Sequence, residues 1–131
     1  MPDQNQPISE FKSKGGLKRI FSALMYSIAG FKSAWQNEHA FRQELILIVP
    51  AIFLALLLRV SAIQKLALVA VLLLVLIVEL INSAIEAVVD RISLERHPLS
   101  KNAKDFGSAA VMLALMLAVA TWGVIVFPLF Y

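Results

Sequence analysis

Apolar positions divide the chain into four helical segments after a polar start. Over residues 17–35, apolar side chains recur at steps of three and four, with basic and small polar residues between them, which predicts an amphipathic helix. Three further segments, 36–60, 63–90 and 108–129, are apolar over most of their length. Each can supply the roughly 20 residues that a helix needs to cross a bilayer. Residues 1–16 are polar and contain two prolines, so we expect a flexible leader there.

The predicted fold is all-α, with an N-terminal helix on the membrane surface and three transmembrane helices in a single membrane domain, 1–131. A basic amphipathic helix with aromatic residues suits a membrane surface, although a helix packed on other protein helices would show the same spacing. Only 16% of the residues are charged and 60% are hydrophobic. This composition excludes a disordered chain, and a soluble domain of this length would need a more polar surface. Without cysteine, disulfides, thiol nucleophiles and zinc–thiolate sites are excluded.

The basic residues predict the orientation of the helices. Of the 12 Lys and Arg residues, ten lie at or before residue 42, where the first span begins, or in 91–104, between the second and third; only Arg59 and Lys65 flank the connection between the first and second. Segments rich in Lys and Arg stay on the cytoplasmic side. We therefore expect a cytoplasmic N-terminus and a C-terminus on the opposite side. The net charge of +3 does not indicate nucleic-acid binding, because the chain has no basic run.

Acidic residues enter an apolar span in the sequence ELINSAIEAVVD. Glu79, Asn82, Glu86 and Asp90 follow one another at steps of three, four and four, so they share one stripe of a helix. A carboxylate inside a membrane is costly unless it is paired, bound to a metal or neutral. Two Glu residues on one face repel each other unless a cation lies between them. The stripe therefore predicts a cation-binding site near the cytoplasmic interface. A polar seam that holds helices together is the structural alternative.

Two other charged motifs flank the predicted spans. EHAFRQE places Glu38 and Arg42 one helical turn apart, and AKDFGSA places Lys104 and Asp105 before the last span. The first motif would also serve as an interfacial charge collar, and residues 105–108 would also serve to begin the last helix. A phosphate-binding loop, a dinucleotide-binding motif and a nucleophile elbow are all missing from the sequence. These residues alone therefore predict an acidic cation site and do not identify a nucleotide.

Together the three motifs resemble the small prokaryotic membrane diacylglycerol kinases, of the type found in Gram-negative bacteria. ELINSAIEAVVD matches the signature of that family, EHAFRQE and AKDFGSA match at the expected separations, and the resemblance covers about residues 19–122. It implies transfer of the γ-phosphoryl group of ATP to 1,2-diacylglycerol, which gives phosphatidate in phospholipid recycling. It also implies Mg²⁺ and a homotrimer in the bacterial inner membrane, with sites built between protomers and a periplasmic C-terminus.

The resemblance implies roles for individual residues. Glu79 would be the general base for the lipid hydroxyl, Glu38 and Glu86 would hold Mg²⁺, and we expect Asn82 to orient Glu79 or Glu86. The positions implied to contact ATP are Arg19, Tyr26, Glu38, Glu86, Glu95, His97, Lys104 and Asp105. The positions implied on the lipid side are Ala23, Trp35, Arg42, Gln43, Glu44, Glu79 and Ser108.

Three other functions remain open at this point. An undecaprenol kinase would use the same chemistry on a longer polyprenyl alcohol. A small cation-binding or cation-conducting oligomer would line a pathway with the acidic stripe. A helix-packing scaffold would use the stripe only to hold helices together.

Overall fold

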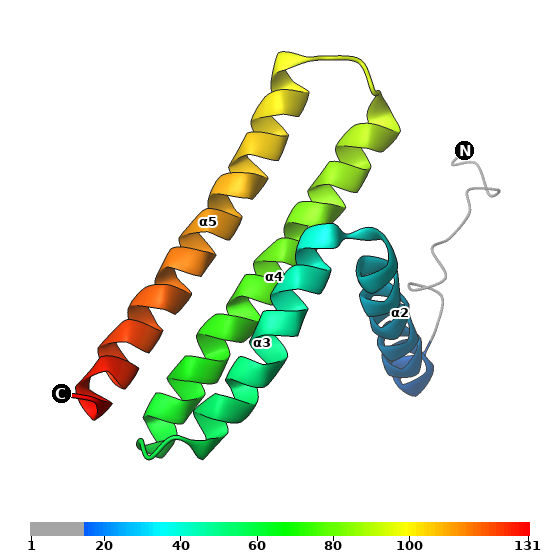
Figure 1. Cartoon of the computed structure of the whole chain (residues 1–131). Helices are drawn as coiled ribbons and strands as arrows, with labels where there is room; N and C mark the ends of the chain where they lie inside the picture. The colour runs from blue at the N-terminus through cyan, green and yellow to red at the C-terminus, as the bar shows by residue number, and fades with distance from the viewer. Residues whose placement is uncertain (1–14) are drawn as a thin grey trace. The chain divides into compact units, whose positions relative to one another are not determined.

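A computed structural model describes residues 15–131, and its regular elements within that range are all helical (Figure 1). They are α2 (Gly16–Asn37), α3 (His39–Leu57), α4 (Ala62–Ile92), α5 (Pro98–Val126) and a final 3₁₀ turn, η1 (Phe127–Leu129). The chain divides into two compact units, Met1–Asn37 and Glu38–Tyr131, and each is described by itself. The expected leader, 1–16, lies almost wholly outside the described residues.

Helix α2 is the described element of the first unit and contains the helix expected at 17–35. The large apolar side chains that recur along it are all exposed. They are Leu17, Ile20, Phe21, Leu24, Ile28, Phe31 and Trp35. An exposed apolar row of this kind is typical of an interaction surface.

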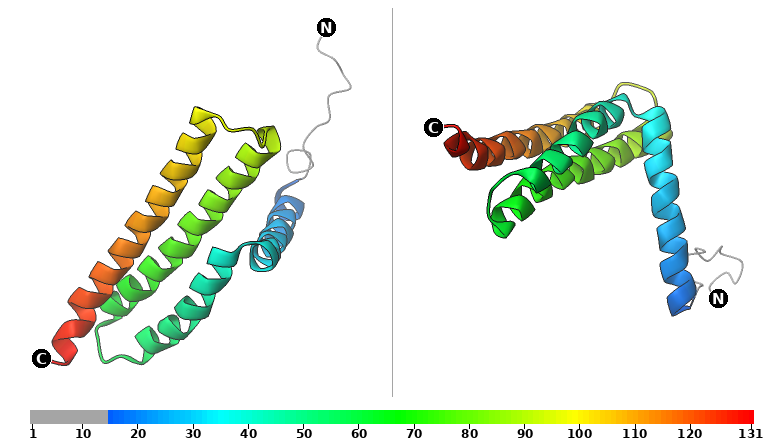
Figure 2. Two further views of the ribbon diagram at one scale, coloured as in Figure 1. Left: turned by 45° about the horizontal axis from the view of Figure 1, so that its top comes forward. Right: turned by 60° about the horizontal axis from the view of Figure 1, so that its bottom comes forward.

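The second unit holds three helices that are long and apolar enough to cross a membrane, as expected. They have 19, 31 and 29 residues in α3, α4 and α5. At about 1.5 Å per residue, these lengths correspond to about 28, 46 and 44 Å. Figures 1 and 2 show α4 and α5 side by side and antiparallel, with α3 against α4. Because the hydrocarbon core of a bilayer is about 30 Å thick, both α4 and α5 are long enough to extend beyond it.

Helix α5 begins at Pro98, ten residues before the span expected at 108–129. His97 is its N-cap, and the Leu99 N–H donates to His97 Nδ1 at 3.1 Å. Proline fits the first position of a helix because its missing N–H would have no intrahelical partner there. The interpretation that residues 105–108 begin the helix is therefore wrong. The first turns of α5 are polar and lack the apolar period by which the sequence revealed the other helices.

The buried positions of the three helices follow the helical period. In α3 they are Phe41, Ile48 and Ala55, and in α5 they are Gly107, Ala114 and Ala118. In α4 they are Leu68, Leu72, Val75, Leu76, Glu79 and Asn82. The small residues of α5 allow its backbone to lie close to α4, and Trp122 Nε1 donates to the Leu68 carbonyl oxygen at 3.2 Å. The buried stripe of α4 thus changes from apolar to polar without leaving the core.

Side-chain hydrogen bonds fix the turn between α3 and α4. Ser61 is the N-cap of α4: its Oγ accepts the Gln64 N–H at 3.2 Å, and Gln64 Oε1 accepts the Ser61 N–H at 3.0 Å. Lys65 Nζ donates to the Leu56 carbonyl oxygen at 2.9 Å, at the C-terminal end of α3. These bonds satisfy backbone groups that a helix end leaves without intrahelical partners.

We expect Ser61→Ala to lower the free energy of unfolding by about 1 kcal/mol, because it removes the N-cap acceptor. Reversible unfolding in mixed micelles by added sodium dodecyl sulfate measures this change. Ser61→Thr is the matched control, because it keeps the hydroxyl oxygen. Equal stability of the alanine variant and the wild type would contradict the role of this cap.

Candidate active site

The polar end of the buried α4 stripe runs from the core to the surface. Glu79 is 5% exposed and Asn82 is 8% exposed. Glu86 is half-buried, and Asp90 is exposed. Glu79 and Glu86 are separated by about 10 Å along the helix axis. One helix face therefore presents a buried carboxylate, an amide, a half-buried carboxylate and an exposed one in sequence.

Two carboxylates from the start of α3 join this group. Glu38 immediately precedes α3, and its charge, like that of Glu86, acts on Glu79. Glu44 lies one turn inside α3 and is also within range of the Glu79 charge. Glu44 Oε2 is buried without a hydrogen-bond partner. The motifs EHAFRQE and ELINSAIEAVVD are thus brought together by the fold, and their like charges favour a bound cation.

Asn82 connects this group to α5. Its Nδ2 donates to Glu86 Oε1 at 3.3 Å, whereas its Oδ1 is buried without a hydrogen-bond partner. Of the two acidic residues that Asn82 was expected to orient, the structure links it to Glu86. On α5, Gly107 lies directly opposite the Asn82 amide.

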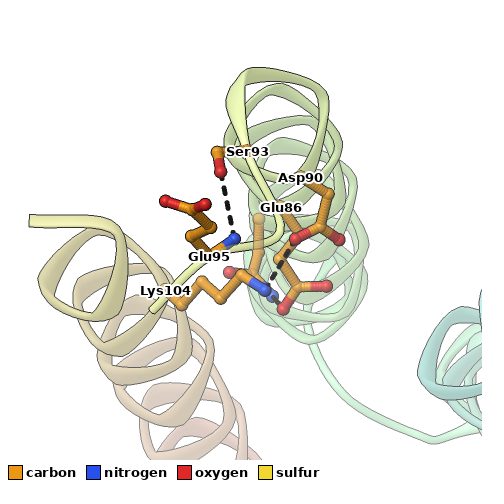
Figure 3. A network of polar contacts seen from close by, with 6 residues as sticks. Glu86, Asp90, Ser93, Glu95 and Lys104 are labelled. Atoms are coloured by element: carbon orange, nitrogen blue, oxygen red, sulfur yellow. Dashed lines mark hydrogen bonds and ion pairs between the residues drawn. The ribbon is translucent and has the colours of Figure 1, made fainter. Parts of the chain in front are cut away.

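A polar pocket of about 730 Å³ lies where α4 ends and α5 begins. Its volume is within the range of about 300–1,000 Å³ usual for small-molecule sites. The charged and imidazole side chains that line it are Asp90, Glu95, Arg96, His97, Lys101, Lys104 and Asp105. Figure 3 shows Glu86 and Asp90 of α4 and Lys104 of α5 converging beneath the connection that carries Ser93 and Glu95. Lys104 Nζ lies 2.8 Å from Asp90 Oδ1, and the Glu86 charge also acts on this lysine.

This pocket, referred to below as the polar pocket, collects four of the expected ATP-contacting residues. They are Glu95, His97, Lys104 and Asp105. It also contains Arg96 and Lys101, which were not among the candidates. Lys101 forms an ion pair with Asp105 one turn along α5. The four-residue spacing of Lys101 and Asp105 would have predicted that they share a helix face, if the predicted last helix had begun at Pro98.

The remaining candidates lie elsewhere in the two units. Arg19, Ala23, Tyr26 and Trp35 belong to α2, where the spacing of the first three places them on one helix face. Arg42, Gln43 and Glu44 lie in the first turns of α3, and the Arg42 guanidinium is 3.3 Å from His39 Nδ1. Ser108 is exposed on α5, next to the buried Gly107.

A second pocket, of about 250 Å³, lies between α3, α4 and α5. Glu44 is its one charged lining residue. The others are Leu47, Ile48, Ala51, Leu72, Val75, Leu115, Ala118, Val119 and Trp122. This apolar pocket is suited to a hydrocarbon chain, and Glu44 is a polar group at its margin.

Within the described part of the chain, no group of three or more His, Asp or Glu residues is arranged to hold a metal ion. A cation bound among these carboxylates would therefore need ligands from another molecule. Mg²⁺ is commonly bound in this way, by one or two carboxylates together with water and the phosphates of a substrate.

Comparison with known proteins places these features in a family. The model of the prokaryotic diacylglycerol kinases matches residues 25–126. This chain belongs to the prokaryotic diacylglycerol kinase family. It is 58% identical over 117 residues to the diacylglycerol kinase of Pseudomonas aeruginosa, covering 89% of this chain and 95% of that protein. It is 50% identical over 115 residues to that of Escherichia coli K12, covering 88% and 94%. The family resemblance inferred from the three motifs is confirmed.

We expect Glu79→Gln to stabilise the protein in metal-free buffer. The change replaces a buried carboxylate among like charges with a neutral amide of similar size. The free energy of unfolding should rise, because the neutral amide is not repelled by the neighbouring carboxylates of Glu38 and Glu86. Unfolding in mixed micelles with a chelator present measures it. The exposed Glu95→Gln should change stability by less than about 0.5 kcal/mol. A loss of stability in Glu79→Gln would contradict this account of the carboxylate group.

Proposed function

We propose that this protein is a lipid kinase that transfers the γ-phosphoryl group of ATP to 1,2-diacylglycerol and gives phosphatidate and ADP. Membership of the diacylglycerol kinase family supports this activity. The observation that carries it is the order of features along α4. Leu72 and Val75 line the apolar pocket, Glu79 and Glu86 follow, and Asp90 lines the polar pocket. A hydrocarbon-bearing alcohol and a nucleotide would thus meet at the carboxylates from opposite directions.

The length of α4 supports different depths in the bilayer for the lipid and nucleotide ends of the site. If the hydrocarbon core of the bilayer begins near Ala62, Glu79 lies about 26 Å along the helix and Glu86 about 36 Å along it. The core is about 30 Å thick, so Glu79 lies just inside its far boundary and Glu86 lies among the headgroups. The hydroxyl of diacylglycerol resides at that boundary, whereas ATP approaches from water. The depth of Glu79 matches the lipid hydroxyl, and that of Glu86 matches the phosphates.

Glu79 is the residue best placed to act as general base. It is buried, and a carboxylate kept from water retains its basicity for a nearby hydroxyl. Taking the proton from the lipid hydroxyl as it attacks the γ-phosphorus would prevent a build-up of positive charge on the attacking oxygen. The neighbouring carboxylates of Glu38 and Glu86 are then free for another role.

That second role is to hold Mg²⁺, and the residues present fit this ion. Glu38 and Glu86 supply two carboxylates, and the Asn82 bond fixes the orientation of Glu86. Mg²⁺ held there with ATP would neutralise phosphate charge. The cationic side chains of the polar pocket, above all Lys104, would attract the remaining phosphate charge. Glu95, His97 and Asp105 would complete the nucleotide contacts.

The wider assembly follows the family resemblance and the exposed surfaces. The family resemblance supports a membrane-surface helix in which Arg19 and Tyr26 contact ATP and Ala23 and Trp35 contact lipid. Arg42, Gln43, Glu44 and Ser108 would contact the lipid headgroup region. Large apolar residues exposed on all three membrane helices suit contact with lipid. Assembly as a homotrimer with sites built between protomers is proposed on the family resemblance. The distribution of basic residues supports insertion in the bacterial inner membrane with a cytoplasmic N-terminus and a periplasmic C-terminus.

Purified protein in mixed micelles with labelled ATP, Mg²⁺ and diacylglycerol tests this function. We expect labelled phosphatidate, and far less transfer to undecaprenol in a parallel reaction. Preferential labelling of undecaprenol would identify the polyprenol kinase alternative. Ion flux through liposomes without ATP consumption would support a cation-conducting oligomer instead. Arg59→Gln, at the opposite end of the helices from the carboxylates, is the control variant and should keep wild-type turnover.

The two acidic roles predict different kinetic effects. Glu79→Gln should lower kcat by about 10²–10⁴-fold, the usual contribution of a general base, with little change in the Mg²⁺ concentration required. Glu86→Gln and Glu38→Gln should instead raise that concentration sharply. Magnesium titrations at saturating lipid separate the two effects. Wild-type turnover in Glu79→Gln would remove it as the base, and unchanged titrations in the other variants would remove them as ligands.

A further inference from the structure

Gly107 occupies the point where α5 approaches the Asn82 side chain most closely. A Cβ atom added at Gly107 would lie 2.0 Å from Asn82 Oδ1, 3.1 Å from its Cγ and 3.7 Å from its Cβ. The first distance is impossible for two non-bonded atoms, the second is tight, and the third is ordinary contact. The absence of a side chain at residue 107 is therefore required by the amide of Asn82, and not by the backbone of α4.

The position of this amide has a consequence for Glu86. Asn82 Nδ2 donates to Glu86 Oε1, whereas Oδ1 points at Gly107 and has no hydrogen-bond partner. Because the Asn82 amide is planar, displacing Oδ1 rotates Nδ2 as well. Asn82 is 8% exposed, so the amide has little free space in which to turn without losing its bond to Glu86.

We infer that Gly107 is a positioning residue: by leaving room for Oδ1, it holds the Asn82 amide in the orientation that directs the Glu86 carboxylate toward a bound cation. This inference rests on the proposed role of Glu86. Groups that orient a metal-binding side chain commonly contribute 10–100-fold to metal affinity. A methyl group at residue 107 would act on the cation site without touching the cation or its ligands.

Gly123 provides a matched control on the same helix. A Cβ atom added there would meet no atom within 4 Å. Gly107→Ala and Gly123→Ala therefore make the same chemical change in α5 and favour the helix to the same degree. They differ in whether the new methyl group meets Asn82.

The first test needs neither nucleotide nor turnover. With ¹⁵N-labelled asparagine, the side-chain amide signal of Asn82 is assigned by its loss in Asn82→Ala. In Gly107→Ala this signal should shift, while those of Asn37 and Asn102 stay in place. In Gly123→Ala all three should remain at their wild-type positions. An unmoved Asn82 signal in Gly107→Ala would overturn the inference, even if the wild-type protein proves to be a kinase.

The second test measures Mn²⁺ binding by electron paramagnetic resonance, with a non-hydrolysable ATP analogue present. Gly107→Ala and Asn82→Ala should each weaken Mn²⁺ binding 10–100-fold, and Gly123→Ala should change it less than twofold. The double variant Asn82→Ala/Gly107→Ala should bind Mn²⁺ as Asn82→Ala does, because truncation of Asn82 leaves room for the methyl group. A further full-sized loss in the double variant would show that Gly107 acts through helix packing and would overturn the inference.

The double variant also covers a failure of Gly107→Ala to fold. If the steric conflict lies with the Asn82 amide, removing that amide restores folding. Failure of both variants to fold would place the conflict with the backbone and contradict the inference. Failure of the wild type to phosphorylate diacylglycerol would instead contradict the proposed function, and would leave the amide signals to decide the role of Gly107.

Discussion

The structure depends on a constraint set by Glu79: a carboxylate occupies a core position of a helix that is apolar over most of its length. Leu68, Leu72, Val75, Glu79 and Asn82 lie on one buried stripe at steps of four, three, four and three. Burying a carboxylate without a partner is costly, and further carboxylates nearby increase that cost. A fold optimised for stability alone would place an apolar residue at position 79. The arrangement is reasonable if a cation and a reacting hydroxyl use these groups.

Helix α5 packs closely on α4 and so encloses the polar end of this buried stripe. Gly107, Ala114 and Ala118 present almost no side chain to α4, so the two backbones approach closely along their length. At one end this approach confines the Asn82 amide, and at the other it brings Trp122 to the Leu68 carbonyl. A larger residue at Ala114 or Ala118 would separate the helices, whereas a methyl group at Gly107 would meet the Asn82 amide. The small residues therefore contribute to the site even though none of them carries a functional group.

Much of the fold was predictable because apolar periodicity reports directly on helices that bury one face. The three apolar helices, and the single helix face shared by the acidic residues of α4, could be predicted from that pattern. The first turns of α5 were missed because residues 98–107 mix polar and apolar side chains without an apolar helical period; the structure shows a His97 cap and a Lys104–Asp90 ion pair there. The ion pair joins α5 to α4 and is not visible before these helices are placed side by side, whereas the cap is local to residues 97–99.

The missed residues of the site share this physical reason. Arg96 and Lys101 line the pocket because the short connection places the end of α4 beside the start of α5, and that arrangement cannot be read from the sequence. The significance of Gly107 could not be read from its own position, because a glycine is sterically required only relative to the atom opposite it. Glu79 and Glu86 were recognisable from sequence because a charge in an apolar helix is conspicuous without any partner.

The charges around the polar pocket connect the topology of the chain to its chemistry. In the proposed orientation, Arg91, Arg96, Lys101 and Lys104 keep the connection between α4 and α5 in the cytoplasm. Three of these four residues also line the polar pocket, where they would face the phosphates of a nucleotide under the proposed function. The charges that fix how the protein inserts therefore also fix the side on which its pocket opens. Reversing the orientation would require removing the cations that a nucleotide site needs, so orientation and access to ATP depend on the same residues.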